Sequence, residues 1–551
     1  MHAALRSAFL SVLLSLNLLS NLYALEEHPL IKWMSSQKNQ DFSTLNSLFK
    51  AELHKYIDSE GRVTKTLQNA LTQIEQKYSS NFQEKDWAIF QEALAEIGAK
   101  TKKDLQVPRN RTPVWLLKNG PLHDFRSSKD LPKLADIVVV GAGLTGASAA
   151  YHLSDLAKAG KSIVVIESDQ VAFQSSGKNG GNFQLLPEGY FDRYDGMVQE
   201  REEWLQKNHP KLSKDIIHEL AKKEAAIIYD FTYKNSVRFR NMVEQEKIDC
   251  DFSSAGWLKI ASSLGEQQAL YSDTKWMNID QRVPFEVWSQ EKLEKTIGIK
   301  NPYVARFIPK NGNYHPYKFV TQVLERSIKK GVKLFTGVKV LKIQSLDNGK
   351  VEIHTNNGLI IAKKVIVATN SQTPQIFPDL SAIKTHESFI INLEHVKNNL
   401  KGMTVTERQG DIYYNFPKSF NYKIGDQHRG MLHYGLDFDE SLPIKDPEQR
   451  YAHQFSVIKK FTDERYPETK GQPASRFWSG PMGFTKDKVP VIGFYHPKGA
   501  KKQNNIVVAA AFQGYGGSFC MQAGYVAAEM AKSGLPHPDV PENMFSPHRF
   551  R

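Results

Sequence analysis

A glycine-rich loop between a strand and a helix is the feature that most limits how this chain can fold. Asp136–Val140 is a short β-branched run typical of a buried parallel strand, and the loop GAGLTG follows it directly at 141–146. The alanine-rich segment 144–160 predicts a helix, and Ser162–Ile166 predicts a second buried strand. This strand–helix–strand unit has the length that a parallel crossover needs, about 30 residues, and predicts a Rossmann-like sheet.

The same unit carries the residues of a dinucleotide site. Gly141, Gly143 and Gly146 form a GxGxxG pattern, and Glu167 stands at the end of the second strand. Such glycines let a pyrophosphate approach the N-terminus of the helix, where free N–H groups and the helix dipole favour negative charge. The glutamate can accept hydrogen bonds from the ribose hydroxyls. The pattern predicts a bound dinucleotide but does not separate FAD from NAD.

Three later stretches of the chain bear on that choice. The segment SSGKNGGN at 175–182 is too rich in glycine for a helix, so we expect a loop that offers backbone and side-chain hydrogen bonds to the cofactor. Gly331–Ile343 and Leu359–Asn370 predict strands that return to the first sheet. Asn505–Gly517 predicts a buried strand closed by a glycine turn, with a helix from about Ser518. The dipole of that helix would stabilise the negative charge of a reduced flavin.

From about Leu131 to Gly534 the chain resembles the D-amino-acid oxidase-like family of FAD oxidoreductases, which includes sarcosine oxidase, glycine oxidase and gamma-glutamylputrescine oxidase. The resemblance lies in GAGLTG, SSGKNGGN, the Ala-Thr-Asn turn at 368–370, the segment Trp478–Gly493 and the closing GYGG. It implies an α/β fold with a Rossmann-like FAD-binding domain built from discontinuous segments. It also implies an α+β substrate domain with a large mixed sheet.

The resemblance implies which residues hold FAD, with Val338 near the adenine and Ala368-Thr369 near the phosphates. The full expected set is Gly141, Gly143, Gly146, Glu167, Ser176, Gly177, Asn179, Gly180, Val338, Ala368, Thr369, Gly514, Tyr515, Gly516 and Gly517. Relatives that tether the flavin use a cysteine near the WSGPMGFT segment or a histidine in the SSGKNGGN loop. In this chain Gly480 and its neighbours stand in the WSGPMGFT segment, and the SSGKNGGN loop has no histidine. We therefore expect non-covalent FAD.

The expected domain limits follow from the same match. The FAD-binding domain comprises 134–189, 311–378 and 476–535, and the substrate domain comprises 190–310 and 379–475. Residues 107–133 are rich in proline, glycine and basic side chains, which is typical of a linker, and 536–551 form a C-terminal tail.

A hairpin within the substrate domain carries the expected substrate contacts. Asp411–Phe416 and Arg429–Gly435 alternate as strands do, and Tyr414, Arg429 and His433 are the polar groups expected beside the flavin. Asn415 stands where some relatives have an arginine for a substrate carboxylate, which favours a plain or substituted amine over an amino acid.

The expected reaction oxidises a C–N bond of an amine or amino acid by hydride transfer to the flavin, and water hydrolyses the imine. Oxygen is one possible electron acceptor. A dehydrogenase that passes electrons to a quinone or protein, and a nucleic-acid-modifying relative, are the alternatives. The net charge of +13 is spread along the chain without an aromatic-basic stripe, so we expect no nucleic-acid partner.

The N-terminus has the order of a secretory signal. Arg6 precedes an apolar block from Phe9 to about Leu19, and the small residue Ala24 precedes an acidic turn. We expect 1–24 to be a signal peptide that exports the protein to the periplasm or outside, with no membrane span left in the mature chain. A buried helix in a cytoplasmic protein and an uncleaved anchor remain open. Residues 25–106 predict a helical extension.

Two cysteines, Cys250 and Cys520, lie far apart in the sequence and form no CxxC pair. A structural metal site of the usual Cys/His type is therefore not expected. One disulfide is arithmetically possible, and two buried thiols are the alternative.

Overall fold

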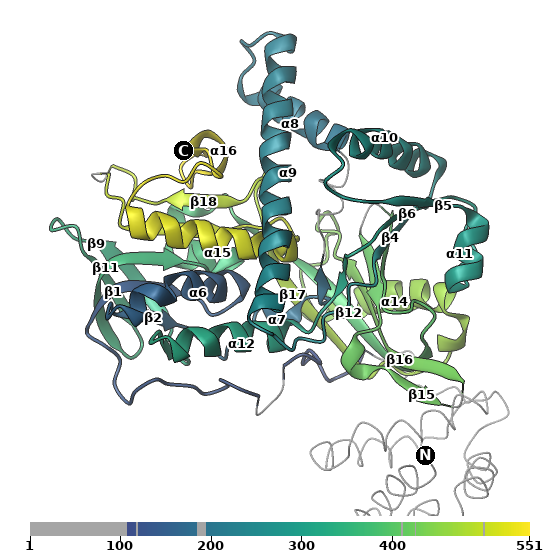
Figure 1. The fold of residues 1–551 in the computed structure, drawn as a ribbon, viewed down its shortest axis with the longest axis horizontal. Coiled ribbons are helices and arrows are strands. Elements are labelled where there is room, and N and C mark those ends of the chain that lie inside the picture. Colours follow the sequence, from purple (N-terminus) through teal and green to yellow (C-terminus); the bar gives the residue numbers. More distant parts are fainter. Residues whose placement is uncertain are drawn as a thin grey trace, which may run out of the picture.

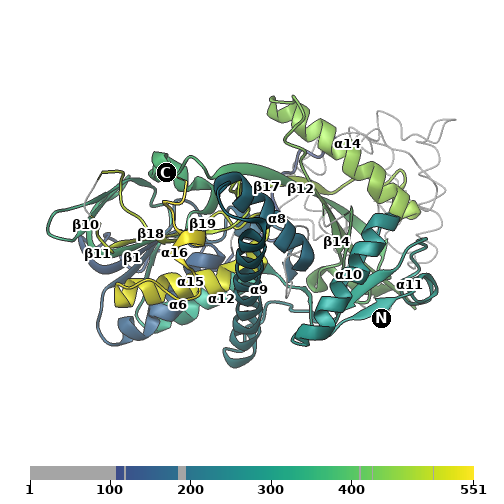
Figure 2. The ribbon, with the colours of Figure 1, turned by 90° about the horizontal axis from the view of Figure 1, so that it is seen from above.

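The computed structural model describes residues 107–550 apart from 117–119, 184–193, 409–410, 425 and 500–501. The expected signal peptide at 1–24 and helical extension at 25–106 lie outside the described residues. The described residues form two large sheets, of eight and nine strands, and a two-stranded one, and the long helix α9 (Lys214–Gln245) lies between the two large sheets (Figures 1 and 2). Within these limits no helix is both long enough and apolar enough to cross a bilayer.

The smaller sheet confirms the Rossmann-like prediction. Its eight strands include a parallel core in the order β19-β11-β1-β2-β8, with β18 antiparallel at one edge; β10 pairs with β11, and β9 pairs with β10. The strands are β1 (Leu134–Val140), β2 (Ile163–Ile166), β8 (Lys333–Phe335), β9 (Val340–Ser345), β10 (Val351–Thr355), β11 (Gly358–Val367), β18 (Val491–Phe494) and β19 (Ile506–Ala510). β2 and β19 are buried along their whole length, as their continuous apolar runs require in a covered parallel sheet.

Three helices pack together beside the parallel strands: α6 (Leu144–Lys158), α12 (Pro316–Lys329) and α15 (Gly516–Ser533). Small residues let α6 and α15 approach closely, and Ser148 Oγ donates a hydrogen bond to the Met521 carbonyl at 2.7 Å. α6 and α15 both begin at the carboxyl ends of parallel strands. Their N-termini therefore point toward the same edge of the sheet, where nucleotides bind in such folds.

The large sheet is mixed, as expected. Its nine strands run in the order β17-β12-β16-β14-β13-β4-β6-β5 with β15 beside β16, and β13–β4 is a parallel pair among antiparallel ones. The strands are β4 (Trp257–Ile260), β5 (Glu286–Trp288), β6 (Ala305–Ile308), β12 (Lys384–Lys397), β13 (Thr404–Glu407), β14 (Ile412–Asn415), β15 (Tyr422–Ile424), β16 (Gln427–Asp437) and β17 (Arg476–Phe484). The predicted strand pair is confirmed, because β14 and β16 pair directly.

One face of the large sheet is covered by helix α14 (Pro447–Arg465), and the apolar core between them includes Phe389, Tyr414, Tyr434 and Phe455. Three further helices belong to this part of the chain: α8 (Tyr194–Asn208), α10 (Leu264–Asp280) and α11 (Gln290–Ile297). The opposite face of the large sheet is turned toward the smaller sheet and its helices. A short strand pair, β3 (Asn182–Phe183) with β7 (Gly312–Asn313), lies beside that face.

Helix α9 is joined to the first turn of α15 by a buried amide. Asn235 Nδ2 donates to the Gly517 carbonyl at 2.8 Å, and its Oδ1 accepts from the Met521 N–H at 2.9 Å. In a regular helix these two backbone groups bond to each other. The Asn235 amide therefore bridges them, and it fixes the start of α15 relative to α9.

Residues 107–116 and 120–133, which we expected to form a linker, pack against both sheets. Trp115 is fully buried, and its Nε1 donates to the Asn179 carbonyl at 2.7 Å. Asn110 accepts a backbone hydrogen bond from Phe477 of β17, and Phe125 accepts one from Thr336 beside β8. Proline and glycine mark irregular backbone, but they do not tell whether that backbone is exposed or packed.

The segment expected as a tail is also packed, through Arg549. Its guanidinium contacts the Asp487 carboxylate at 2.7 and 3.0 Å, with side-chain exposures of 6% and 2%, and Arg201 donates to the Asp487 carbonyl. Removing one partner of a buried ion pair leaves an unpaired charge. We expect Arg549→Ala to lower the free energy of unfolding by about 3–5 kcal/mol.

Chemical denaturation of the purified protein measures this effect. The exposed pair Lys292–Glu286 supplies the control, and Lys292→Ala should cost less than about 1 kcal/mol. Equal stability of the two variants would contradict a structural role for the C-terminal segment.

Candidate active site

A cavity of about 520 Å³ lies between the smaller and the large sheet. It begins at the carboxyl ends of β1 and β2 and reaches β12, β14 and β16 of the large sheet. Its wall combines the glycine loop, the segment after β2, the turn after β11 and the start of α15. Segments that are far apart in the sequence therefore meet around one elongated space.

The glycine loop is shaped so that its backbone faces this cavity. A side chain at Gly143 would place its Cβ 2.7 Å from Ser176 Oγ, and that hydroxyl accepts a hydrogen bond from the Leu144 N–H at 2.9 Å. A Cβ at Gly146 would lie only 1.8 Å from the Gly141 carbonyl oxygen, so the helix can start this close to the strand only with glycine. The loop leaves room for a ligand on the cavity side.

Glu167 lies at the end of β2, as predicted. Its Oε2 accepts from the Ala142 N–H at 2.8 Å, and its Oε1 accepts from the Asp169 N–H at 3.0 Å. Burial raises the pKa of Glu167, against these hydrogen bonds that lower it. The carboxylate is thus held rigidly beside the cavity, in the position of a ribose-binding acid.

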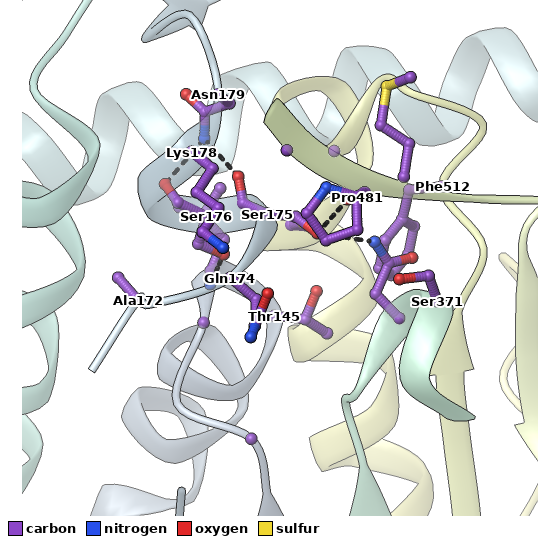
Figure 3. Close-up of a pocket in the computed structure, with 18 of the residues that line it drawn as sticks. Thr145, Ala172, Gln174, Ser175, Ser176, Lys178, Asn179, Ser371, Pro481 and Phe512 are labelled. Atoms are coloured by element: carbon purple, nitrogen blue, oxygen red, sulfur yellow. Dashed lines mark hydrogen bonds between the residues drawn. The ribbon is translucent and has the colours of Figure 1, made fainter. Parts of the chain in front are cut away.

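The SSGKNGGN segment corrects one expectation. We expected a loop, but Ser175–Lys178 forms one helical turn, α7, followed by the extended Asn179. The Asn179 amide closes the turn by donating to the carbonyls of Ser175 and Ser176. This local side-chain capping stabilises a turn that composition alone disfavours. Figure 3 shows Ser175 and Ser176 on one side of the pocket, with Pro481 and Phe512 on the other.

Most of the expected FAD residues meet at this cavity. Gly146 and Gly177 do not line it and instead pack behind its wall, where a Cβ on Gly177 would lie 2.4 Å from the Ala172 carbonyl oxygen. The other thirteen line it: Gly141, Gly143, Glu167, Ser176, Asn179, Gly180, Val338, Ala368, Thr369, Gly514, Tyr515, Gly516 and Gly517. Their contacts with FAD stay a prediction.

The expected substrate contacts are placed differently, because none of Tyr414, Arg429 and His433 lines the cavity. Tyr414 points to the opposite face of the sheet, where it is fully buried and donates a hydrogen bond to Glu407. Successive strand residues alternate between faces, so its neighbour Tyr413 lines the cavity instead. Arg429 lies toward the other end of β16 and donates to the His395 carbonyl at 2.8 Å.

His433 is on the same sheet face as Tyr413, but it lies deeper along the strands. It pairs in register with Asn392 on one side and Asn415 on the other. All three side chains are fully buried, and neither His433 ring nitrogen has a hydrogen-bond partner among the described residues. Burial lowers the pKa of His433 to about 3, so the ring is neutral. The ring of Trp115 lies 4.8 Å from it and separates it from solvent.

The large sheet contributes cavity residues that the sequence did not single out. Ser388 of β12, Thr406 of β13, Tyr413 of β14 and Asp437 of β16 line this end. A Cβ at Gly435, directly opposite Tyr413, would lie 2.1 Å from the tyrosine ring. A glycine facing an aromatic residue in the predicted hairpin is the signal that could have identified Tyr413.

The chain fits FAD on the evidence of these residues. Glycine backbone lines the cavity at the N-termini of α6 and α15, an acid stands at the end of β2, and the first turn of α15 forms part of the wall. Among the described residues, no cluster of histidine, cysteine or acid side chains could hold a metal ion.

The cysteines bear on how the cofactor is held. Both are free and buried, and burial raises the pKa of Cys520, which lines the cavity, to about 12. A thiol in this environment stays protonated and is a poor nucleophile. We expect acid denaturation to release all of the FAD into the supernatant. Flavin that remains with the precipitated chain, and that Cys520→Ala abolishes, would contradict this prediction.

Comparisons with known proteins indicate the same cofactor as the residues of the cavity. The family described as FAD dependent oxidoreductase matches residues 136–530. Probable oxidoreductase OrdL of Haemophilus influenzae is 22% identical over 406 residues, which cover 72% of this chain and 82% of the relative. Gamma-glutamylputrescine oxidoreductase of Escherichia coli is 23% identical over 426 residues, 75% of this chain and 87% of the relative.

Solved structures of low identity share the fold. L-amino acid deaminase from Proteus myxofaciens matches with a TM-score of 0.56 and 16% identity, covering 81% of this chain and all of that one (100%). Glycine oxidase from Geobacillus kaustophilus matches with a TM-score of 0.55 and 15% identity, covering 76% of this chain and 99% of that one. With the family match spanning the glycine loop, both sheets and α15, the chain belongs to the FAD-dependent oxidoreductases of the amine and amino-acid oxidase type.

Proposed function

We propose that this protein oxidises the C–N bond of a small amine, with water hydrolysing the resulting imine. The observation that carries this proposal is the cavity itself, which joins the glycine loop and Glu167 to Ser388, Tyr413 and Asp437 of the large sheet. A cofactor laid from the first group toward the second would present its reactive end to a substrate held by the large sheet. The names of several relatives, such as gamma-glutamylputrescine oxidoreductase and N-methyl-L-tryptophan oxidase, refer to C–N substrates.

The residues of the chain would bind and orient FAD and would shield the reacting groups from water. FAD, when bound, supplies the hydride acceptor. Gly143 and the N-terminus of α6 would hold the pyrophosphate, and Glu167 would hold the ribose. The first turn of α15 would offer its positive dipole end to the reducible ring, and the Asn235 amide fixes that turn. Phe512, Met482 and Pro481 supply an apolar wall that limits water.

Anaerobic titration of the purified FAD-loaded protein with a panel of primary, secondary and N-methyl amines and amino acids tests the proposal. We expect at least one amine to bleach the flavin absorption stoichiometrically. The rates at which oxygen, a quinone and an artificial acceptor re-oxidise the reduced flavin are then compared to identify the electron acceptor. Flavin that no amine or amino acid reduces, but that another hydride donor does, would overturn the proposed reaction.

We also propose that the protein is exported. The N-terminal order of Arg6, an apolar block and Ala24 supports this proposal. Fractionation of cells that express the full chain, with N-terminal sequencing of the product, tests it. We expect a mature chain that begins after Ala24 in the exported fraction, and an intact Met1 in the cytoplasm would contradict export.

A further inference from the structure

The large-sheet end of the cavity carries a carboxylate with no basic partner. Five charged side chains line the cavity among the described residues, and four of them, Glu167, Asp169, Lys178 and Lys339, come from segments outside the large sheet. The backbone and Cβ of Lys178 pack beside Gly480 of β17, but its Nζ lies 4.9 Å from the centre of the Phe173 ring. Asp437, the last residue of β16, is the one that the large sheet contributes. No arginine lines the described wall at all.

The surroundings of Asp437 form a built polar site. Ser388 of β12 lies directly opposite Asp437 in the strand register, and its hydroxyl is 2.9 Å from the hydroxyl of Tyr413. Two glycines from different segments make room for the Tyr413 ring: a Cβ on Gly180 would lie 2.7 Å from it, and a Cβ on Gly435 would lie 2.1 Å from it. The tyrosine is thereby held in the wall of the cavity with its hydroxyl beside Ser388.

The Asp437 carboxyl group has no basic partner among the groups that shift its pKa in the described part of the chain. Burial raises the pKa of its carboxyl to about 7, and the Asp411 charge adds to this, while the hydrogen bond from Ser388 lowers it. A half-buried carboxylate of this kind is stabilised when a cation enters the cavity.

We propose that Asp437, with Ser388 and Tyr413, binds the protonated amino group of the substrate as it enters, and that this end of the cavity selects amines that lack a neighbouring carboxylate. The Asp437 carboxylate then accepts the ammonium proton, so that the nitrogen lone pair is free to form the C=N bond when the hydride leaves. The proposal rests on the amine oxidation proposed above, which makes this the substrate end. A substrate carboxylate placed here would meet the Asp437 carboxylate with no arginine or lysine from the large sheet to compensate it. An alkylammonium ion finds one carboxyl group, whose ionised form it stabilises, and two hydroxyl oxygens.

Binding of two ligands of equal shape and opposite charge tests the proposal without any turnover. tert-Butylamine is a cation whose nitrogen-bearing carbon has no hydrogen, so it cannot donate a hydride, and pivalate is its carboxylate counterpart. Titration of the FAD-loaded protein with each, followed by the flavin absorption spectrum and by calorimetry, gives the two dissociation constants. We expect the wild-type protein to bind tert-butylamine more tightly than pivalate.

Asp437→Asn should weaken tert-butylamine binding about 10- to 100-fold, because a charge-assisted contact is lost, and should reduce the discrimination against pivalate. Asp437→Glu should retain the preference for the cation. Asp439→Asn is the matched control, since it removes the same charge from an exposed position two residues away and should change neither constant. FAD content and thermal unfolding show whether each variant is folded.

Equal affinity of the wild-type protein for the two ligands would overturn the proposal, even if a variant failed to fold. Unchanged tert-butylamine binding in folded Asp437→Asn would overturn it as well. Both results are independent of the amine titration. If amines reduce the flavin but tert-butylamine binding does not depend on Asp437, the proposed site is wrong and the proposed reaction stands. If tert-butylamine binding depends on Asp437 but no amine reduces the flavin, the proposed reaction is wrong and the binding site stands.

Discussion

Gly143→Val is expected to leave a folded protein that no longer retains FAD. The pyrophosphate must approach the backbone at this position, and a branched side chain would fill that space. The structure adds a second obstacle, because the new Cβ would lie 2.7 Å from Ser176 Oγ. Purification of the variant, with its flavin content measured against protein concentration, gives the result directly.

The contribution of Ser176 can be separated from that of the cofactor. Without its hydroxyl, the nearest Ser176 atom to the new Cβ would be its own Cβ, at 3.6 Å, which is ordinary contact. Gly143→Ala combined with Ser176→Ala should therefore keep part of the FAD, whereas Gly143→Val with Ser176→Ala should keep none. Stoichiometric FAD in the folded valine variant would mean that the cofactor does not cross this loop.

Gly516→Val is expected to lower the reduction potential of the flavin and to slow its anaerobic reduction by amine by about 10²–10³-fold. Gly516 is the first residue of α15 and lines the cavity, so a side chain there would hold the cofactor away from the positive end of the helix dipole. The fold should survive, because the added Cβ would meet only Cys520 Sγ, at 3.3 Å.

Gly265→Val provides the matched control for this prediction. Gly265 also lies in the first turn of a helix, α10, but it is exposed and does not line the cavity. Its variant should have the potential and the reduction rate of the wild-type protein. Wild-type behaviour of a folded, FAD-loaded Gly516→Val protein would show that another element faces the flavin.

The nucleotide half of the molecule could be predicted because its signals are local. The glycine loop, the buried β-branched strands and Glu167 lie within one continuous segment, and their spacing determines their geometry. The later segments, such as Ala368-Thr369, reach the same cavity because strand ends in a parallel sheet meet at one edge.

The substrate half could not be predicted to the same depth. The sequence indicated a hairpin, but a pattern of alternating residues does not say which face of the strands is turned to the cavity. We therefore expected Tyr414 at the cavity, whereas its neighbour Tyr413 lines it. Asp437 and Ser388 come together only through the register of β12 with β16, which are separated in the sequence. The Asn235 amide that bridges the first turn of α15 is likewise a tertiary contact with no local signal.

Anaerobic single-turnover reduction with an amine deuterated at the carbon next to nitrogen tests the central claim most directly. The amine is the one that bleaches the flavin most fully in the titration panel. It is mixed rapidly with the FAD-loaded protein while the flavin absorption is followed. We expect the flavin to be reduced fully and deuterium to slow the reduction, because the C–H bond breaks as the hydride leaves. Flavin that stays oxidised with every amine offered would contradict the claim that this cavity oxidises C–N bonds.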